Sequence, residues 1–231
     1  MSGQTVQSAR LNIDSGIVTS MAGEWGVGQR ALARISGDAL RLSYIDRVEV
    51  TRGARPLGTV SAVPMHDLTP ELITFLRPSQ YCQSDQLGPD AAAPFGLLTG
   101  GARIEAILDW MATEMTYDPF YTTPQTTVLE TWSTRRGVCR DYAHLFCGLA
   151  RASGIPARYV AVYGAPVDPP DFHAVVEVWL EDGWHLLDPT AMCSPDRLAV
   201  IGVGRDAADV PFMETPDDAW LMDQSVRVTE A

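Results

Sequence analysis

The chain has 231 residues, of which 46% are hydrophobic and 20% charged, so it can bury a sizeable core and its composition argues against global disorder. Its 17 basic and 29 acidic residues give a formal net charge of −12, which argues against a nucleic-acid binder and against binding to an anionic membrane surface, since both need clustered Lys and Arg. The N-terminus MSGQTVQSAR lacks the basic and apolar regions of a signal peptide, and no stretch approaches the roughly 20 apolar residues of a membrane span, so we expect a cytoplasmic protein.

Residues 1–75 are predicted to form a β-rich N-terminal region. The stretches ARLNIDSGIV, ALRLSYI and RVEVTRG show partial alternation of apolar and polar residues, and Gly-containing turn signals separate them. Within this region, LTPELITFLRPS predicts a short helix with Pro70 in its first turn and Pro78 as its stop. Residues 76–99 are rich in Ala, Pro and Gly, which is typical of a linker or long loop.

Residues 100–200 are predicted to form the core of the protein. ARIEAILDWMATEM has the spacing of an amphipathic helix, residues 127–135 predict a second helix, and CRDYAHLFCGLARASG predicts a third, largely buried one that stops at Gly154. ARYVAVYG, DFHAVVEVWL and WHLLDPT are typical of strands. Residues 201–231 are expected to be a C-terminal extension packed on this core.

The four cysteines are expected to be free thiols, because a cytoplasmic protein usually keeps its thiols reduced. Their spacings match no zinc pattern, so we expect neither a metal nor a cofactor. Taken singly, Cys139 and Cys147 are most simply small buried hydrophobic residues, Cys193 is expected to be a structural thiol, and Cys82 is left open. The four are Cys82, Cys139, Cys147 and Cys193.

Cys139 differs from the other cysteines in its surroundings. In the stretch TRRGVCRDY it follows a glycine and opens a predicted helix. A helix N-terminus favours negative charge, and the thiolate is the reactive form of cysteine. Arg135, Arg136 and Arg140 add positive charge nearby. These arginines could favour the thiolate, bind an acidic substrate or simply be solvated.

A nucleophilic cysteine needs a base, and the base needs a third group to orient it. His173 opens a predicted strand and Asp188 closes the next one. A four-residue loop over residues 179–182 would place these two side chains directly opposite each other. A two-residue turn at Asp182 and Gly183 would instead separate them by about 13 Å. We therefore predict the four-residue loop, while a strand-end histidine and an aspartate before proline also have ordinary structural explanations.

Three stretches in this order resemble the bacterial transglutaminase-like superfamily. They are RRGVCRDYAHLFCGLARASGIPARYV, DFHAVVEVWL and GWHLLDPT, which match the nucleophile, histidine and aspartate motifs of that family. The resemblance covers about residues 100–195, and LRPSQYC looks like a segment that some members carry upstream. It implies an α+β fold with a papain-like transglutaminase core, in which the nucleophile helix packs on an antiparallel sheet.

By this resemblance Cys139 is the nucleophile, His173 the general base and acid, and Asp188 the group that orients the imidazole. The backbone N–H of Cys139 is the expected oxyanion donor. Tyr117 and Trp132 are candidates for a second donor, although simple core packing explains both.

Two further residues inside the matched motifs, Tyr142 and Asp171, are candidates for lining the cleft or for holding the local backbone.

The implied reaction is acyl transfer from an amide or peptide bond through a thioester, with a peptide or protein as substrate. Nothing in the sequence marks an amine-acceptor site, so hydrolysis by a transglutaminase-like cysteine protease or amidase is favoured over amine transfer. The alternative is a non-catalytic peptide-binding module that keeps the fold. The filled triad positions count against that alternative, and oligomeric state is left open.

Overall fold

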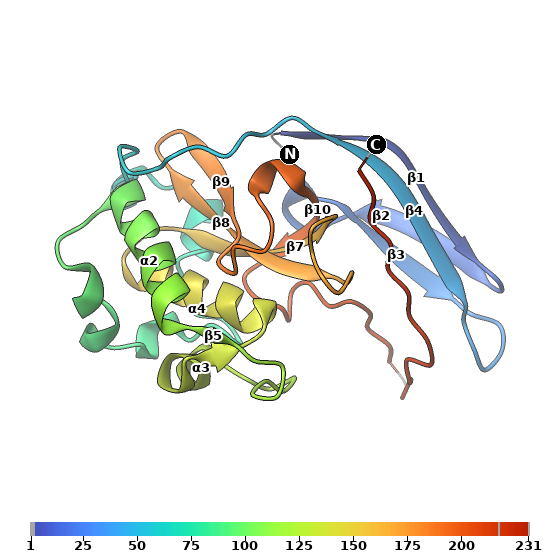
Figure 1. Ribbon diagram of the computed structural model, residues 1–231. Helices are drawn as coiled ribbons and strands as arrows, with labels where there is room; N and C mark the ends of the chain where they lie inside the picture. Colours follow the sequence, from blue (N-terminus) through green and yellow to red (C-terminus); the bar gives the residue numbers. More distant parts are fainter. Residues whose placement is uncertain (1–2, 217, 231) are drawn as a thin grey trace.

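The computed structural model describes residues 3–216 and 218–230. Its centre is a four-stranded antiparallel sheet with the strand order β10–β7–β8–β9 (Figure 1). The strands are β7 (Ala157–Gly164), β8 (His173–Leu180), β9 (Gly183–Leu187) and β10 (Leu198–Gly204). Strand β8 is buried along almost its whole length. Its run HAVVEVWL is nearly continuous in apolar residues because both faces of this central strand are covered.

Helices cover one face of the sheet, as predicted. The α-helices are α1 (Pro70–Thr74), α2 (Gly100–Glu114), α3 (Val128–Thr134) and α4 (Cys139–Ala152). Helix α4 packs against β7 and β8, and α2 and α3 pack against α4. On α2, Ile104, Ile107 and Met111 are fully buried while Leu108 is only partly buried, so the predicted apolar stripe of this helix is confirmed.

The opposite face of the sheet is covered by the N-terminal region. Val160 and Val162 of β7 and Val175 of β8 belong to a second apolar cluster that includes Val27, with Trp25 packed against it. Alternate residues of the same strands, such as Ala174 and Val176, belong to the helix-side cluster. The sheet therefore separates two cores, as the period-2 alternation of strand side chains requires.

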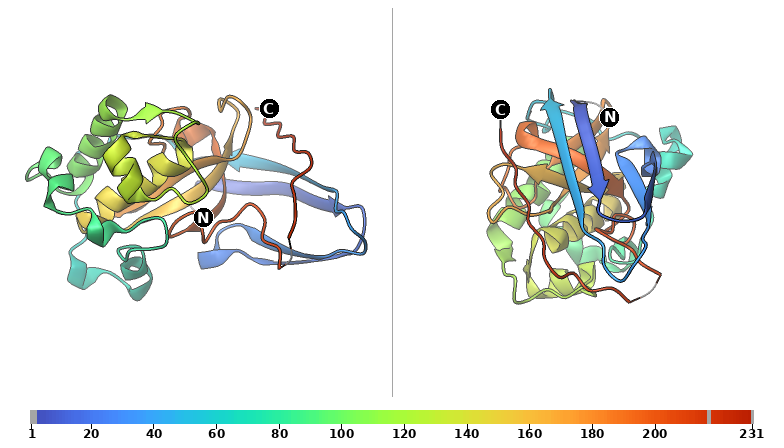
Figure 2. Two further views of the ribbon diagram at one scale, coloured as in Figure 1. Left: turned by 90° about the horizontal axis from the view of Figure 1, so that it is seen from below. Right: turned by 90° about the vertical axis from the view of Figure 1, so that its right-hand side faces the viewer.

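Two antiparallel ribbons form the predicted β-rich N-terminal region. Strands β1 (Gln4–Ile13) and β4 (Leu42–Val50) form one ribbon, and β2 (Ile17–Ala22) and β3 (Gln29–Arg34) form the other. Figure 2 shows the ribbons extending away from the helical end of the molecule. A short 3₁₀ segment, Glu24–Gly26, lies between β2 and β3, and another, Met65–Asp67, lies between β4 and α1. A third, Pro195–Arg197, lies between β9 and β10.

Residues 76–99 do more than connect the two regions. They contain three 3₁₀ turns, Ser84–Gln86, Pro89–Ala91 and Ala93–Phe95. The side chains of Cys82, Leu87 and Phe95 are buried in the helix-side core. A segment with the composition of a loop therefore supplies apolar residues to the core between its Pro and Gly residues.

The C-terminal part of the chain also contributes to the sheet. Strand β10 carries the sheet to Gly204, past the expected core boundary at residue 200. From residue 211 to the end, the described residues have no regular secondary structure and are mostly exposed. None of the helices in the described residues has the length and apolar character needed to cross a membrane.

Candidate active site

Cys139 is the first residue of α4, as the sequence predicts. The start of this helix is fixed by Asp141, whose side chain is fully buried and whose Oδ2 accepts a hydrogen bond of 2.9 Å from the N–H of Val138. Gly137 makes this possible, because a Cβ at that position would lie 2.6 Å from the Cβ and Oδ2 of Asp141. The G-V-C-x-D motif is thus a physical unit that aims the free N–H groups of a helix start at the thiol.

His173 and Asp188 are in direct contact. His173 is the first residue of β8 and is 2% exposed, and its Nε2 lies 2.9 Å from Oδ2 of Asp188. Cys139 lies near the imidazole and is among the groups that raise the pKa of His173. Since Nε2 is occupied by Asp188, the nitrogen that faces Cys139 is Nδ1. The structure therefore brings the three predicted residues together at one place.

The predicted hairpin register is wrong, although the contact that it was meant to explain exists. Leu180 pairs with Gly183, so β8 and β9 are joined by a two-residue turn at Glu181 and Asp182 instead of a four-residue loop. In this register Asp188 would pair with a residue two positions after His173. The two side chains lie on the same face of the sheet, and a diagonal pair of about 7–8 Å between backbones can be bridged by an imidazole and a carboxylate.

The carboxylate of Asp188 is held by a complete set of donors. Its Oδ1 accepts from the N–H and hydroxyl of Thr190, at 2.9 and 2.7 Å, and its Oδ2 accepts from the N–H of Cys193 at 3.0 Å as well as from His173. Sequence reasoning missed the parts played by Thr190 and Cys193. The Asp-Pro-Thr sequence could have indicated a turn in which the aspartate bonds two residues onward, but the N–H of Cys193 has no sequence signal.

The charges of this pair are shifted by the same contacts. Burial lowers the pKa of His173, but hydrogen bonds to Asp188 and Cys139 outweigh burial and raise this pKa to about 9. Burial raises the pKa of Asp188, but hydrogen bonds from His173 and Thr190 outweigh it and hold this pKa below its usual value. At neutral pH the pair is therefore an imidazolium facing a carboxylate.

Two of the other predicted cleft residues, Tyr117 and Tyr142, contact each other near the start of α4. Burial raises the pKa of the Tyr117 hydroxyl to about 12, and the neighbouring Cys139 adds to this shift. The buried ring of Tyr142 lies 6.0 Å from the ring of Tyr117, measured between centroids. These aromatic residues form one wall beside the nucleophile.

The remaining two predicted cleft residues are engaged elsewhere. Trp132 stacks on Trp110 at 5.2 Å, and the guanidinium of Arg135 lies 3.6 Å from the centre of the Trp132 ring. The exposed Asp171 accepts hydrogen bonds from its neighbour's N–H and from the side chain of Gln224 at 3.0 Å. Trp132 is therefore part of a stacked cluster, and Asp171 anchors the C-terminal segment close to His173.

The arginines beside the nucleophile bind protein groups rather than free solvent. Arg140 donates to the hydroxyl of Thr122 at 3.0 Å and to the carbonyl of Thr123. Arg136 lies 4.4 Å from the centre of the Tyr121 ring. Both arginines therefore help to hold the loop that follows Tyr117. Of the three explanations offered for these charges, simple solvation does not fit Arg136 and Arg140.

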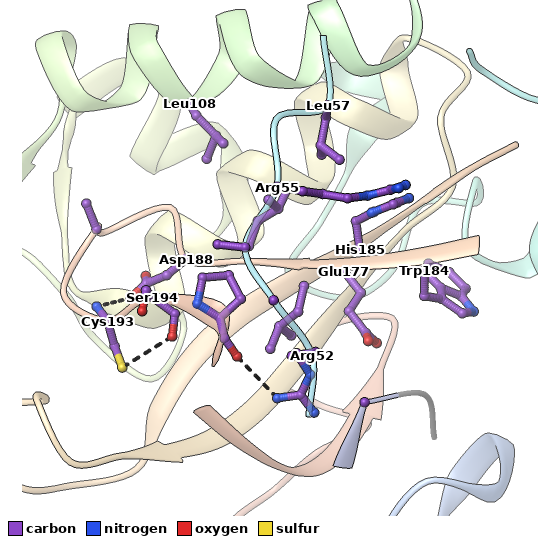
Figure 3. A pocket seen from close by; sticks show the side chains of 17 residues that line it. Arg52, Arg55, Leu57, Leu108, Glu177, Trp184, His185, Asp188, Cys193 and Ser194 are labelled. Atoms are coloured by element: carbon purple, nitrogen blue, oxygen red, sulfur yellow. Dashed lines mark hydrogen bonds between the residues drawn. The ribbon is translucent and has the colours of Figure 1, made fainter. Parts of the chain in front are cut away.

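One cavity borders Asp188 but not Cys139. It has a volume of about 610 Å³ and is lined by residues that include Arg52, Trp184 and Cys193 (Figure 3). Within it, the carboxylate of Glu177 is already paired with the buried guanidinium of Arg158 at 2.6 Å. The lining of this cavity includes Asp188 but neither Cys139 nor His173, so we do not place the reaction there.

Comparison with known proteins identifies the family. Residues 91–189 match the family model of the transglutaminase-like superfamily. A crystal structure from Cytophaga hutchinsonii described as a "Putative Cysteine Protease" is similar over 90% of this chain and 74% of that one, with 32% identity and a TM-score of 0.80. The chain belongs to the transglutaminase-like superfamily. Its helix α4 packed on the antiparallel sheet is the papain-like core of that superfamily.

Curated relatives match a shorter part of the chain. Uncharacterized proteins from Mycobacterium tuberculosis and Mycobacterium bovis are 40% identical over 135 residues, which is 50% of this chain and 43% of each relative. A protein-glutamine gamma-glutamyltransferase from Pseudomonas aeruginosa is 38% identical over 98 residues, or 15% of its length. The match thus spans less than half the length of these relatives.

Within the described part of the chain, no three His, Cys, Asp or Glu side chains are grouped closely enough to hold a metal ion. The transglutaminase-like core instead offers one thiol, one imidazole and one carboxylate in series.

Proposed function

We propose that this transglutaminase-like protein is a cysteine-dependent hydrolase or acyltransferase that acts on amide or peptide bonds. The observation that carries the proposal is the position of His173, whose Nε2 lies 2.9 Å from Oδ2 of Asp188 and whose pKa is raised by both Asp188 and Cys139. This is the geometry that nucleophilic catalysis requires, with the base oriented by a third group. In this proposal Cys139 is the nucleophile, His173 the general acid and base, and Asp188 a positioning residue.

The proposed reaction has two steps. The thiolate of Cys139 attacks the carbonyl carbon of the amide, and the C–N bond breaks as the leaving nitrogen takes a proton from Nδ1 of His173. The product of this step is a thioester on Sγ. Water then gives a proton to Nδ1 and attacks the thioester, so that the C–S bond breaks and the acid is released. The thiolate and the imidazolium are restored.

Hydrolysis is the outcome that we favour. The similarity to a structure described as a cysteine protease supports it, whereas the similarity to a protein-glutamine gamma-glutamyltransferase supports amine transfer. An assay with a glutamine-containing peptide separates the two, because water as acceptor gives free carboxylate and a primary alkylamine gives a new amide. A product that carries the amine as its main form would replace hydrolysis by amine transfer within the same mechanism.

Selective alkylation tests the nucleophile. At pH 6 iodoacetamide is expected to label Cys139 and not the three other cysteines, since Cys82 and Cys147 are fully buried and Cys193 is 5% exposed. Exposure alone would give this selectivity, so the decisive comparison is with His173→Gln. Loss of the imidazolium beside the thiol should slow labelling of Cys139 by roughly tenfold or more, because the thiolate is the reactive form.

The matched control for this comparison is His185→Gln. His185 is bonded to Asp182 at 2.6 Å on strand β9 and does not face the thiol. Its replacement should leave the labelling rate unchanged. Equal rates for wild type and His173→Gln would remove the enzyme interpretation and favour the non-catalytic binding module.

The protonation of His173 gives a pH-dependent test. Its pKa is raised from 6.5 to about 9, so the imidazole should remain protonated through neutral pH and lose its proton only as the pH rises through about 9. In an NMR titration, the Hε1 resonance of His173 should therefore move with a midpoint near 9. Asp188→Asn removes a negative partner and should lower this midpoint. A wild-type midpoint at or below 6.5 would contradict the proposed ion pair.

A further inference from the structure

The cavity that borders Asp188 lies between the segment after β4 and the edge strand β9. Residues 52–55 and Leu57 line it on one side, and residues 184–188 line it on the other. Its volume of about 610 Å³ is in the range of small-molecule sites. In Figure 3, Leu57 and Leu108 lie at one end of the cavity and the guanidinium of Arg52 lies at the other. The cavity therefore has an apolar end and a cationic end.

The guanidinium of Arg52 has no partner of opposite charge among the described residues. Its Nη1 donates to the carbonyls of Pro195, at 3.3 Å, and Leu198, and its Nη2 donates to Oε1 of Gln4 at 2.7 Å. These acceptors are neutral, and a guanidinium has more N–H groups than three bonds use. Burial lowers the pKa of Arg52, although the charge of Glu177 opposes this shift. Arg52 is therefore a partly desolvated cation that can still bind a carboxylate.

The other ionisable side chains that line the cavity each have a partner of opposite charge in the described part of the chain. These pairs are Arg55 and His185 with Asp182, Glu177 with Arg158, and Asp188 with His173. One positive charge, on Arg52, is therefore left without a protein counterion at the wall of the cavity. A bound anion would balance it, and a carboxylate matches the planar N–H groups of a guanidinium.

Much of the remaining lining is apolar. It includes the side chains of Leu57, Leu108, Leu186, Leu187 and Ala191. An inorganic anion would leave this apolar surface in contact with water, whereas an apolar group would cover it. We propose that the cavity binds a small organic acid, with its carboxylate on Arg52 and its apolar body against Leu57 and Leu108.

The proposed site is separate from the reacting groups but shares a wall with the loop that orients them. Its lining includes neither Cys139 nor His173, so ligand binding does not depend on the proposed reaction. Asp188 and Cys193 both belong to the lining, and the N–H of Cys193 donates to Oδ2 of Asp188 at 3.0 Å. An acid bound here would contact the loop that holds this carboxylate and leave the thiol open.

Isothermal titration calorimetry with three matched probes tests the ligand class on the unchanged protein. The probe 4-phenylbutyrate has a carboxylate and an apolar ring, 4-phenylbutanamide keeps the ring without the charge, and butyrate keeps the charge without the ring. The amide and butyrate should each bind roughly tenfold or more weakly than 4-phenylbutyrate, because each loses one of the two contacts. Equal affinity of either probe would overturn the proposed ligand class, and absence of 4-phenylbutyrate binding would overturn the site.

The position of the site is tested by Arg52→Gln, which should weaken 4-phenylbutyrate binding by roughly tenfold or more. Arg55→Gln is the matched control, because Arg55 lines the same cavity but is paired with Asp182. It should leave the affinity unchanged, and urea unfolding would show that both variants are folded. In wild-type protein, the amide NMR shifts caused by 4-phenylbutyrate should centre on residues 52–55 and 184–188. Unchanged affinity in Arg52→Gln, or shifts centred on the start of α4, would overturn the proposal.

Discussion

Replacing His173 with glutamine is expected to slow acylation of Cys139 by p-nitrophenyl acetate by roughly 10²- to 10⁴-fold, the usual contribution of a positioned acid or base. The reason is the position of the imidazole between the thiol and Asp188, with Nε2 only 2.9 Å from the carboxylate. Glutamine fills a similar volume and can bond to Asp188, but it can neither carry the positive charge that stabilises the thiolate nor exchange a proton with it.

The measurement is the single-turnover release of p-nitrophenolate, with the acyl adduct on Cys139 identified by mass spectrometry. His185→Gln serves again as the control, because His185 is paired with Asp182 and takes no part in the proposed mechanism. A His173→Gln variant that acylates at the wild-type rate would show that Cys139 reacts without a base. In that case the histidine would be a structural group that satisfies Asp188.

Combining variants separates the two partners of Cys139. Asp188 reaches the reaction only through His173, so Asp188→Asn should slow acylation in the wild-type background and have little further effect in His173→Gln. Residues that act as a unit are strongly non-additive. Fully additive losses would indicate that Asp188 acts independently of His173. It would then act through the loop whose N–H groups, at Thr190 and Cys193, donate to its carboxylate.

The helices and strands around the site follow closely from the sequence. Helix α4 could be placed because a glycine, a run of buried residues and a final Gly154 mark its two ends. The strands could be placed because their apolar runs are bounded by turn residues. These signals are local, so they do not depend on how the strands pair.

The pairing of β8 with β9 could not be predicted in the same way. A two-residue turn and a four-residue loop differ by two residues in cross-strand register, and a shift of two leaves every side chain on its original face. The apolar pattern therefore fits both arrangements. In the observed register His173 and Asp188 meet diagonally, which depends on the backbone turn after Leu187 and on the donors that fix the carboxylate.

The sequence also could not predict which of the two aromatic residues, Tyr117 or Trp132, lies near the nucleophile. Both are aromatic residues with a polar tip, located upstream of Cys139. The two-residue pairing of β5 (Thr116–Tyr117) with β6 (Arg136–Gly137) places Tyr117 beside Gly137, two residues before Cys139, whereas Trp132 lies on helix α3 and stacks on Trp110. A parallel pair as short as this one has no periodicity to detect.

Gly137 lies two residues before the nucleophile, and Gly137→Ala should lower both the stability of the protein and the acylation rate of Cys139. A Cβ there would lie 2.6 Å from the Cβ and Oδ2 of Asp141, closer than such atoms can approach. Asp141 is fully buried and its carboxylate caps the N–H of Val138, so the start of α4 must shift to make room. We expect the free energy of unfolding to fall by ~1–3 kcal/mol, as for other overpacked sites.

The same shift should move the nucleophile. Displacement of a reacting group by about 1 Å can cost around 10²-fold in rate, so acylation of Cys139 should fall by that order even in the folded variant. Gly53→Ala is the control, because a Cβ at Gly53 meets open space. Urea unfolding and p-nitrophenyl acetate acylation would be measured on both. If Gly137→Ala matched Gly53→Ala in stability and rate, the start of α4 would not be held by Asp141, and the G-V-C-x-D motif would need another physical explanation.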